Sequence, residues 1–187
     1  MGERTIEYVL VDDLVPADRN PKNHSIEDLK ASIKRFGYTD PVEIDERTGR
    51  VVSGHGRGKA LAELHAEGVD VPDGVRVEPD GRWSVPVVRG WSSANDDEAS
   101  AYLVGANRLT IAGGWDDAEL AAMLQRVSAT DLGLAGIGYA DDELQQLLIQ
   151  VRAHERHPPA DVDPDDVPAA PPEPVTRLGD LWLLGEH

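Results

Sequence analysis

The sequence contains no cysteine and few aromatic residues. Its 187 residues include no Cys, one Phe, four Trp and four Tyr. The absence of Cys excludes disulfides, thiolate zinc sites and cysteine redox chemistry, and it fits a reducing compartment. Because aromatic residues make up only 5% of the chain, the core must consist mainly of Val, Leu, Ile and Ala.

Long apolar runs and positive charge are also scarce. No apolar run approaches the roughly 18–20 residues of a membrane-spanning helix, and the N-terminus lacks the apolar core of a signal peptide. We therefore expect a cytoplasmic protein without a membrane partner. Lys and Arg number 18 against 35 Asp and Glu, which gives a formal net charge of −17. Since duplex DNA is bound largely through Lys and Arg, we expect any direct DNA binding to be weak or indirect.

The first half of the chain alternates strand and helix signals. Hydrophobic patterning predicts strands within three segments, 5–15, 41–54 and 75–88. The segment 16–24 is rich in turn-forming residues and predicts a loop. A helix follows this loop, with Ser25 and Asp28 at the spacing of a capping box and Gly37 at its end.

The second half is predominantly helical, and it ends in an acidic, proline-rich stretch. Apolar spacing predicts helices within 95–109, 115–127 and 140–151. The expected parts are an α/β core (1–90), a helical extension packed on this core (91–154), a linker (155–174) and a strand-like C-terminal segment (175–187). We interpret the last segment as the start of a further domain.

The densest group of functional residues is the stretch VVSGHGRGKALAEL. Glycines at alternate positions from Gly54 to Gly58 permit positive φ and let a ligand approach the backbone closely. A helix is expected after Gly58, and its first N–H groups, together with Arg57 and Lys59, suit a phosphate. The order strand, glycine-rich turn, helix therefore predicts a phosphate site. A sharp turn with incidental surface charge stays open as the alternative.

Two common phosphate motifs are excluded by single residues. A P-loop requires glycine at position 53 and Ser or Thr at position 60, and this chain has Ser53 and Ala60. A dinucleotide fingerprint requires glycine at position 59, which is Lys59 here. Any phosphate site in this stretch must be of another kind.

An ordered set of segments carries a resemblance to known proteins. The segments are RNPKNH, SIKRFGYTDPVEIDERTGRVVSGHGRGKALAEL, VPVV and ANRLTIAGGWDDAEL. Together, over about residues 5–152, the chain resembles the ParB/sulfiredoxin superfamily, and within it the ParB-like N-terminal domains that precede DNA-modification methyltransferases in bacteria and phages. The C-terminal RLGDLWLLGEH resembles the start of the methyltransferase part. The resemblance implies an α+β fold, with a small mixed sheet and helices followed by a helical subdomain.

The resemblance also implies a nucleotide site that holds CTP or ATP, with or without Mg²⁺. Gly54, Arg57 and Ala60 match the phosphate cradle of ParB proteins, while Gly56 replaces its first arginine and His55 replaces a common acid. The Gly-His-Gly-Arg form is typical of the methyltransferase-linked branch. The candidate nucleotide-binding residues are Gly54, His55, Gly56, Arg57, Gly58, Lys59, Asn107 and Arg108.

His55 and Glu98 are the candidate catalytic residues. For His55, two roles stay open: a donor to phosphate or general acid/base, and a turn histidine that bonds the backbone. Asn107 and its neighbour Arg108 lie where the family has a second nucleotide- or metal-contacting motif. Ala106 replaces the acidic residue usual there, so no metal site is assigned. Mg²⁺ stays an open alternative because helical spacing is expected to bring Glu98 toward Asn107.

These observations support a nucleotide-binding module that regulates DNA modification or gives it specificity, with a DNA methyltransferase domain or protein as partner. The chain lacks an Asp/Asn-Pro-Pro-Tyr/Phe motif and is therefore not a methyltransferase by itself. NTPase or nuclease activity stays open. The alternatives are a metal-dependent DNA nuclease or phosphotransferase of the same fold, and a protein-interaction adaptor with a vestigial ligand site.

Overall fold

The computed structural model describes residues 2–156 of the chain. The last helix extends to Arg156, two residues beyond the expected end of the helical extension at residue 154. The remainder of the predicted linker and the whole strand-like segment 175–187 lie outside the described residues.

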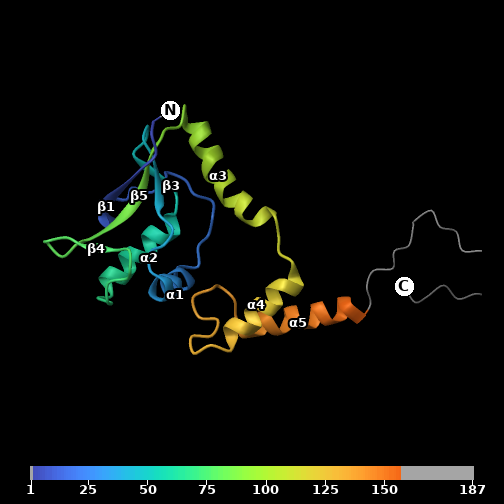
Figure 1. The fold of residues 1–187 in the computed structure, drawn as a ribbon. Coiled ribbons are helices and arrows are strands. Elements are labelled where there is room, and N and C mark those ends of the chain that lie inside the picture. The colour runs from blue at the N-terminus through green and yellow to red at the C-terminus, as the bar shows by residue number, and fades with distance from the viewer. Residues whose placement is uncertain (1, 157–187) are drawn as a thin grey trace, which may run out of the picture.

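A five-stranded mixed sheet forms the centre of the N-terminal part (Figure 1). The strands are β1 (Thr5–Leu10), β2 (Val42–Asp45), β3 (Arg50–Ser53), β4 (Arg76–Val77) and β5 (Trp83–Trp91). Their order is β1-β5-β2-β3, and β4 also pairs with β5. β2 runs parallel to β5, and the other pairs are antiparallel. The expected α+β fold with a small mixed sheet is confirmed.

Helices cover one face of this sheet and then lead away from it. A short 3₁₀ helix, η1, follows β1, and the α-helices come after it. The bounds are η1 (Val11–Asp13), α1 (Ile26–Phe36), α2 (His55–Ala66), α3 (Asp96–Ala112), α4 (Asp117–Ser128) and α5 (Asp141–Arg156). Leu61 and Leu64 of α2 and Ile33 of α1 share one buried cluster with Val85 and Val87 of β5. Since burying each such side chain contributes about 1.5–3 kcal/mol, this cluster is the main hydrophobic core.

The start of α2 differs from the sequence prediction. The helix was expected after Gly58, but it begins at His55, immediately after Gly54. Gly54 is left-handed with φ 90°, and it is the only one of the three glycines with positive φ. Gly56 lies in the first helical turn. A side chain would not fit at this position, because a Cβ would come within 2.7 Å of Leu29 Cδ1. The glycines therefore serve helix packing as much as turn formation.

A buried carboxylate fixes the end of the sheet to the start of α3. Asp45 is fully buried, and its oxygens accept hydrogen bonds from the Ser93 N–H and Oγ at 2.8 Å each and from Thr48 Oγ1 at 2.9 Å. Arg47, in the same turn, bonds Ser93 Oγ at 2.8 Å and Asp96 at 2.6 Å. These bonds join the β2–β3 turn, the residues after β5 and the first turn of α3.

α4, α5 and the segment between them form a second, smaller core. Leu124, Leu134 and Leu144 are its buried members. The segment between the two helices contacts α1, where Arg35 Nη1 donates to the carbonyl oxygens of Gly133 at 2.8 Å and Ala135 at 2.5 Å. Hydrogen bonds from the Arg35 side chain to backbone carbonyls therefore join the segment between α4 and α5 to α1.

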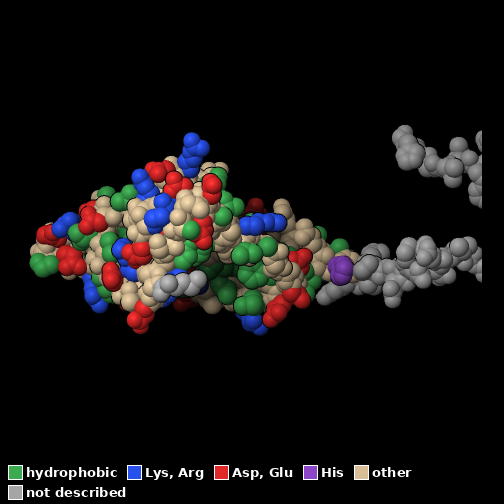
Figure 2. All heavy atoms as spheres, turned by 90° about the horizontal axis from the view of Figure 1, so that it is seen from above, with side chains coloured by type: hydrophobic (Ala, Val, Ile, Leu, Met, Phe, Trp, Pro, Cys, Tyr) green, Lys and Arg blue, Asp and Glu red, His purple; other side chains and the backbone are tan. Residues whose placement is uncertain are grey.

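The C-terminal half of α3 leaves apolar side chains exposed. Val104, Leu109 and Ile111 are 53%, 77% and 66% exposed. Figure 2 shows hydrophobic side chains around a hollow between the α/β core and the helical extension, with charged side chains spread over the rest of that face. Among the described residues, none of the helices is long and apolar enough to cross a membrane.

The Asp45 network predicts a pH-dependent contribution to stability. Burial by itself would raise the pKa of Asp45, but hydrogen bonds from Ser93, Thr48 and the Arg47 N–H outweigh it and hold the pKa below its ordinary value. Asp45→Ala should lower the free energy of unfolding by about 3 kcal/mol at neutral pH, because buried donors lose their acceptor. The deficit should shrink below about pH 4, since a group with a lowered pKa contributes fully above its unfolded pKa and loses this contribution as pH falls through its folded pKa. Urea unfolding across this pH range measures the difference in free energy of unfolding between the variant and the wild-type chain. An unchanged difference at low pH would contradict a stabilising role of the ionised Asp45 carboxylate.

Two helical glycines provide a matched pair. Gly58→Ala should raise the free energy of unfolding by about 0.5–1 kcal/mol, because its Cβ would meet only Leu14 Cδ1 at an ordinary 3.4 Å. Gly56→Ala should lower it by about 1–3 kcal/mol, because its Cβ would lie 2.7 Å from Leu29 Cδ1 and 2.9 Å from the His24 ring. Thermal unfolding of both variants tests the difference, and equal effects at the two positions would refute it.

Candidate functional site

The glycine-rich stretch lies at the junction of β3 and α2, where it opens onto a cavity. Gly54 is the N-cap of α2, and the first intrahelical bond runs from the Gly58 N–H to the Gly54 carbonyl at 3.0 Å. The N–H groups of the first turn before Gly58 therefore have no partner within the helix. The positive end of the helix dipole adds to their effect on an anion. Such an arrangement of backbone N–H groups can accommodate an anion, and the phosphate site stays a prediction.

The cavity at this helix start, called here the helix-start cavity, has a volume of about 440 Å³. Its lining includes Gly54, His55, Gly56, Gly58 and Lys59, so five of the eight predicted nucleotide-binding residues meet there. The loop 16–24 forms the opposite wall. It contributes residues that were not predicted as site residues: Pro16, Ala17, Asn20, Lys22 and His24.

The electrostatic character of this cavity is positive although the chain is acidic. Burial, followed by the charges of Lys22, Arg57 and Lys59, lowers the pKa of His24. The Lys59 side chain is 67% exposed, and its ammonium lies 4.0 Å from Glu63. At that distance and exposure the ion pair is weak, so Lys59 stays able to contact an anion.

His55 lines the cavity but uses its ring to hold the backbone. Its Nε2 accepts a hydrogen bond from the Ala17 N–H at 3.1 Å. Burial and the nearby His24 lower the pKa of His55, against an opposing hydrogen bond with the Val51 backbone. The structure shows this backbone contact, and a role of His55 as a donor to phosphate or a general acid/base stays a prediction. His55 fixes the loop 16–24 to β3 and to the start of α2.

Arg57 does not line the helix-start cavity. Its guanidinium forms an ion pair with Asp40 and lies 3.4 Å from the Pro41 carbonyl oxygen. Its Nε is buried without a hydrogen-bond partner among the described residues. In this structure Asp40 holds the Arg57 side chain outside the cavity lining, and a contact of Arg57 with a phosphate stays a prediction.

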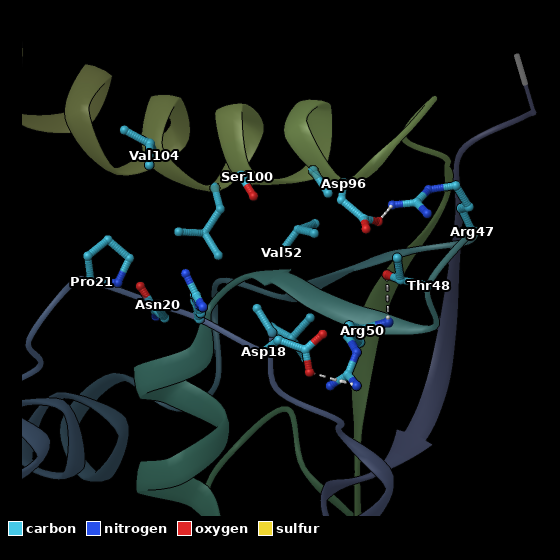
Figure 3. Close-up of a pocket in the computed structure, with 15 residues that line it drawn as sticks. Asp18, Asn20, Pro21, Arg47, Thr48, Arg50, Val52, Asp96, Ser100 and Val104 are labelled. Carbon is cyan, nitrogen blue, oxygen red and sulfur yellow. Dashed lines mark hydrogen bonds and ion pairs between the residues drawn. The ribbon is translucent and has the colours of Figure 1, made fainter.

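A second, larger cavity, called here the α3 cavity, lies between α3, β3 and the loop 16–24 (Figure 3). Its volume is about 870 Å³, and two ion pairs stand in its lining, Arg47–Asp96 at 2.6 Å and Arg50–Asp18 at 2.8 Å. The two cavities share three lining residues, Ala17, Asn20 and Val51. The loop 16–24 thus separates two adjacent cavities.

The structure does not bring Glu98 and Asn107 together. Both belong to α3, nine residues apart, which is about 13 Å along the axis and half a turn around it. Asn107 Nδ2 donates to the Leu103 carbonyl oxygen at 2.8 Å, and the Glu98 carboxylate accepts from the Ala94 N–H. The expected approach of Glu98 to Asn107 is therefore wrong, and with it the basis for Mg²⁺ between them.

Glu98 has a structural role at the start of α3. Asn95 is the N-cap, and its Oδ1 accepts from the Glu98 N–H at 2.9 Å, while the Glu98 carboxylate accepts from the N–H of Ala94, the residue before the N-cap. The spacing Asn-x-x-Glu was a sequence signal for this role. Neither Asn107 nor the exposed Arg108 lines either cavity. Within residues 2–156, no group of three or more His, Cys, Asp or Glu side chains is placed to hold a metal ion.

The site residues missed at the level of sequence come mainly from the loop 16–24. Asn20, Lys22 and His24 are about 30 residues from the glycine stretch, so only the tertiary fold places them beside it. The signal available was the polar segment RNPKNH, in which a helix or strand pattern is absent and donors are concentrated.

Comparison with known proteins gives one clear relative. No family model matches the chain. The ParB-like nuclease domain-containing protein YnaK of Escherichia coli (strain K12) is 42% identical over 69 residues, which are 35% of this chain and 78% of that protein.

A solved structure described as the C2221 form of a Pnob8-like ParB-N domain is 17% identical, with a TM-score of 0.40. The alignment covers 84% of this chain and 65% of that one. The chain thus spans slightly less than two thirds of that domain's length. The family assignment depends on the first relative, most of whose length is matched at high identity, and the chain belongs to the ParB-like family.

Proposed function

We propose that this chain is a nucleotide-binding module that holds the phosphates of CTP or ATP, with or without Mg²⁺, in the helix-start cavity. The observation that carries the proposal is the cavity itself, which joins the free N–H groups of the first turn of α2 to Lys22, His24 and Lys59. A volume of about 440 Å³ lies in the range of small-molecule sites.

The cation pattern supports a phosphate in preference to a neutral ligand. The charges of Lys22 and Lys59 both act on His24, and both lysines belong to the cavity lining. A multiply charged phosphate chain would be attracted by both lysines, whereas a neutral ligand would leave both lysines without a charged partner in the cavity. In a chain with a net charge of −17 such a local excess of cations is notable.

The wider role in this proposal is regulation or specificity in DNA modification, with a DNA methyltransferase domain or protein as partner. This part is supported by membership of the ParB-like family and by the resemblance of the sequence to the methyltransferase-linked branch. The matched relative is described as a ParB-like nuclease domain-containing protein. Metal-dependent nuclease activity is therefore the alternative function, and plasmid cleavage in the presence of Mg²⁺ is the assay for it. An adaptor with a vestigial site would bind no nucleotide.

The two lysines of the cavity give the first test of the proposal. Lys22→Ala and Lys59→Ala should each weaken nucleotide binding about fivefold, because each removes roughly 1 kcal/mol of interaction with phosphate. Lys34→Ala is the matched control, since Lys34 is a half-exposed lysine of α1 that lines neither cavity. Isothermal calorimetry with CTP, ATP, GTP and UTP in the presence of Mg²⁺ measures the dissociation constants.

A thermal-shift screen provides a check that is independent of heat signals. A nucleotide at 100 times its dissociation constant should add roughly 2.7 kcal/mol to the free energy of unfolding. Unchanged melting temperatures with all four nucleotides would exclude the proposed function. Equal losses of affinity in the Lys22, Lys59 and Lys34 variants would place the ligand elsewhere.

Arg57 and Asp40 give a second test. If a bound phosphate draws Arg57 away from Asp40, Asp40→Asn should raise nucleotide affinity about two- to fivefold, the value of an exposed ion pair. Arg57→Ala should lower the affinity in the same assay. If both variants change only the melting temperature, Arg57 serves to tie α2 to the residues before β2 and does not meet the ligand.

A further inference from the structure

The loop 16–24 contains a short chain of hydrogen bonds whose donors and acceptors are fixed. The Lys22 backbone N–H donates to Asn20 Oδ1 at 3.1 Å. A backbone N–H can only donate, so the oxygen of the Asn20 amide must face Lys22. The Asn20 NH₂ group then faces His24 Nε2 at 3.3 Å. Because an amide NH₂ can only donate, Nε2 must be unprotonated.

This bond determines the tautomer of His24. A neutral imidazole with an acceptor at Nε2 carries its proton on Nδ1. Within the described residues no hydrogen bond uses Nδ1. The ring lies directly over the first turn of α2, where a Cβ on Gly56 would come within 2.9 Å of Nδ1. His24 therefore carries its N–H at the end of α2 that attracts anions.

The surroundings favour the neutral ring. Lys22 stands on the same loop, and α2 contributes Arg57, Lys59 and His55, while α1 contributes the apolar Leu29 to the contact at Gly56. Burial and the three cations lower the pKa of His24 below its ordinary value. At neutral pH the ring is uncharged.

We propose that neutral His24, held in its Nδ1–H tautomer by Asn20, fixes the conformation of the loop 16–24 until the ring is protonated, and that it presents its Nδ1–H to the phosphate ligand of the helix-start cavity. The Asn20–His24 hydrogen bond is called here the latch. The latch depends on the loop geometry alone, whereas the donor role rests on the proposed nucleotide function. Asn20 lines both cavities, so the latch fixes a wall that the two share.

Protonation opens the latch for a steric and electrostatic reason. Imidazolium carries N–H on both nitrogens, and its Nε2–H would face the Asn20 NH₂. Rotating the Asn20 amide would restore an acceptor but would break its bond to the Lys22 N–H. Because the folded pKa of His24 lies below the unfolded value of about 6.5, the latch stabilises the loop above that pH and loses its contribution as pH falls through the folded value.

The experiment measures the tautomer and pKa of His24 in the ligand-free full chain. Long-range ¹H–¹⁵N spectra distinguish Nδ1–H, Nε2–H and imidazolium, and loss of the signal in His24→Gln assigns it. The expected wild-type result is the Nδ1–H tautomer at pH 7 and a pKa below 6.5. An Nε2–H tautomer would overturn the proposal without any variant.

Asn20→Asp provides the variant. The new carboxylate accepts from both Lys22 N–H and His24 Nε2–H, so the pKa of His24 should rise by about one unit and the tautomer should change. Asn23→Asp is the matched control, because it makes the same charge change on an exposed neighbour. A shift in Asn20→Asp no larger than in Asn23→Asp would overturn the latch.

Inorganic triphosphate then tests the donor role separately. It should shift the His24 Nδ1 resonance in the wild-type chain and leave the tautomer unchanged. If triphosphate binds by calorimetry but leaves Nδ1 unshifted, His24 is not a ligand donor. If nothing binds, the proposed function fails, while the ligand-free tautomer still decides the latch.

Discussion

The turn from β3 into α2 is the constraint on which the helix-start cavity depends. Gly54 adopts φ 90°, a conformation that favours glycine, and it directs the chain from the sheet straight into a helix. A Cβ at Gly54 would lie 3.0 Å from Val42 Cγ2, and one at Gly56 would lie 2.7 Å from Leu29 Cδ1. Two missing side chains thus let α2 begin in contact with β2 and α1. The helix-start cavity is the space that remains between this helix end and the loop 16–24.

The charged and polar side chains of that turn hold it in place, so a ligand in the helix-start cavity would meet other residues. His55 bonds the Ala17 N–H, and Arg57 pairs with Asp40. Both residues stabilise the approach of neighbouring loops to α2. The cations that face the cavity are Lys22 and Lys59, from a different loop and from the second turn of the helix. Lys22 therefore reaches this cavity through the tertiary fold and not through its place in the sequence.

The order of strands and helices could be predicted from sequence because hydrophobic periodicity and turn residues act locally. The start of α2 could not, because the low helix propensity of Gly56 is overridden by its packing against Leu29. Lys22 and His24 were missed because only long-range folding brings them to α2. The separation of Glu98 from Asn107 is a different case. Nine helical residues turn through two and a half revolutions, so their opposite placement followed from the spacing already visible in the sequence.

The loop 16–24 links the two cavities through histidines on its two sides. His55 bonds its backbone at Ala17, and His24 bonds the Asn20 side chain, while both Ala17 and Asn20 line each cavity. Because the two cavities share these residues, a ligand that displaced the loop in one cavity would alter the shape of the other. Thermodynamic linkage makes this effect reciprocal, because a molecule in the α3 cavity that prefers the same loop position would strengthen binding at α2 by the same factor. The Arg47–Asp96 and Asp45–Ser93 contacts hold the start of α3 to the β2–β3 turn without using the loop 16–24. Residues of α3 line only the α3 cavity, whereas Ala17, Asn20 and Val51 line both, so the loop and β3 are the segments that the two cavities have in common.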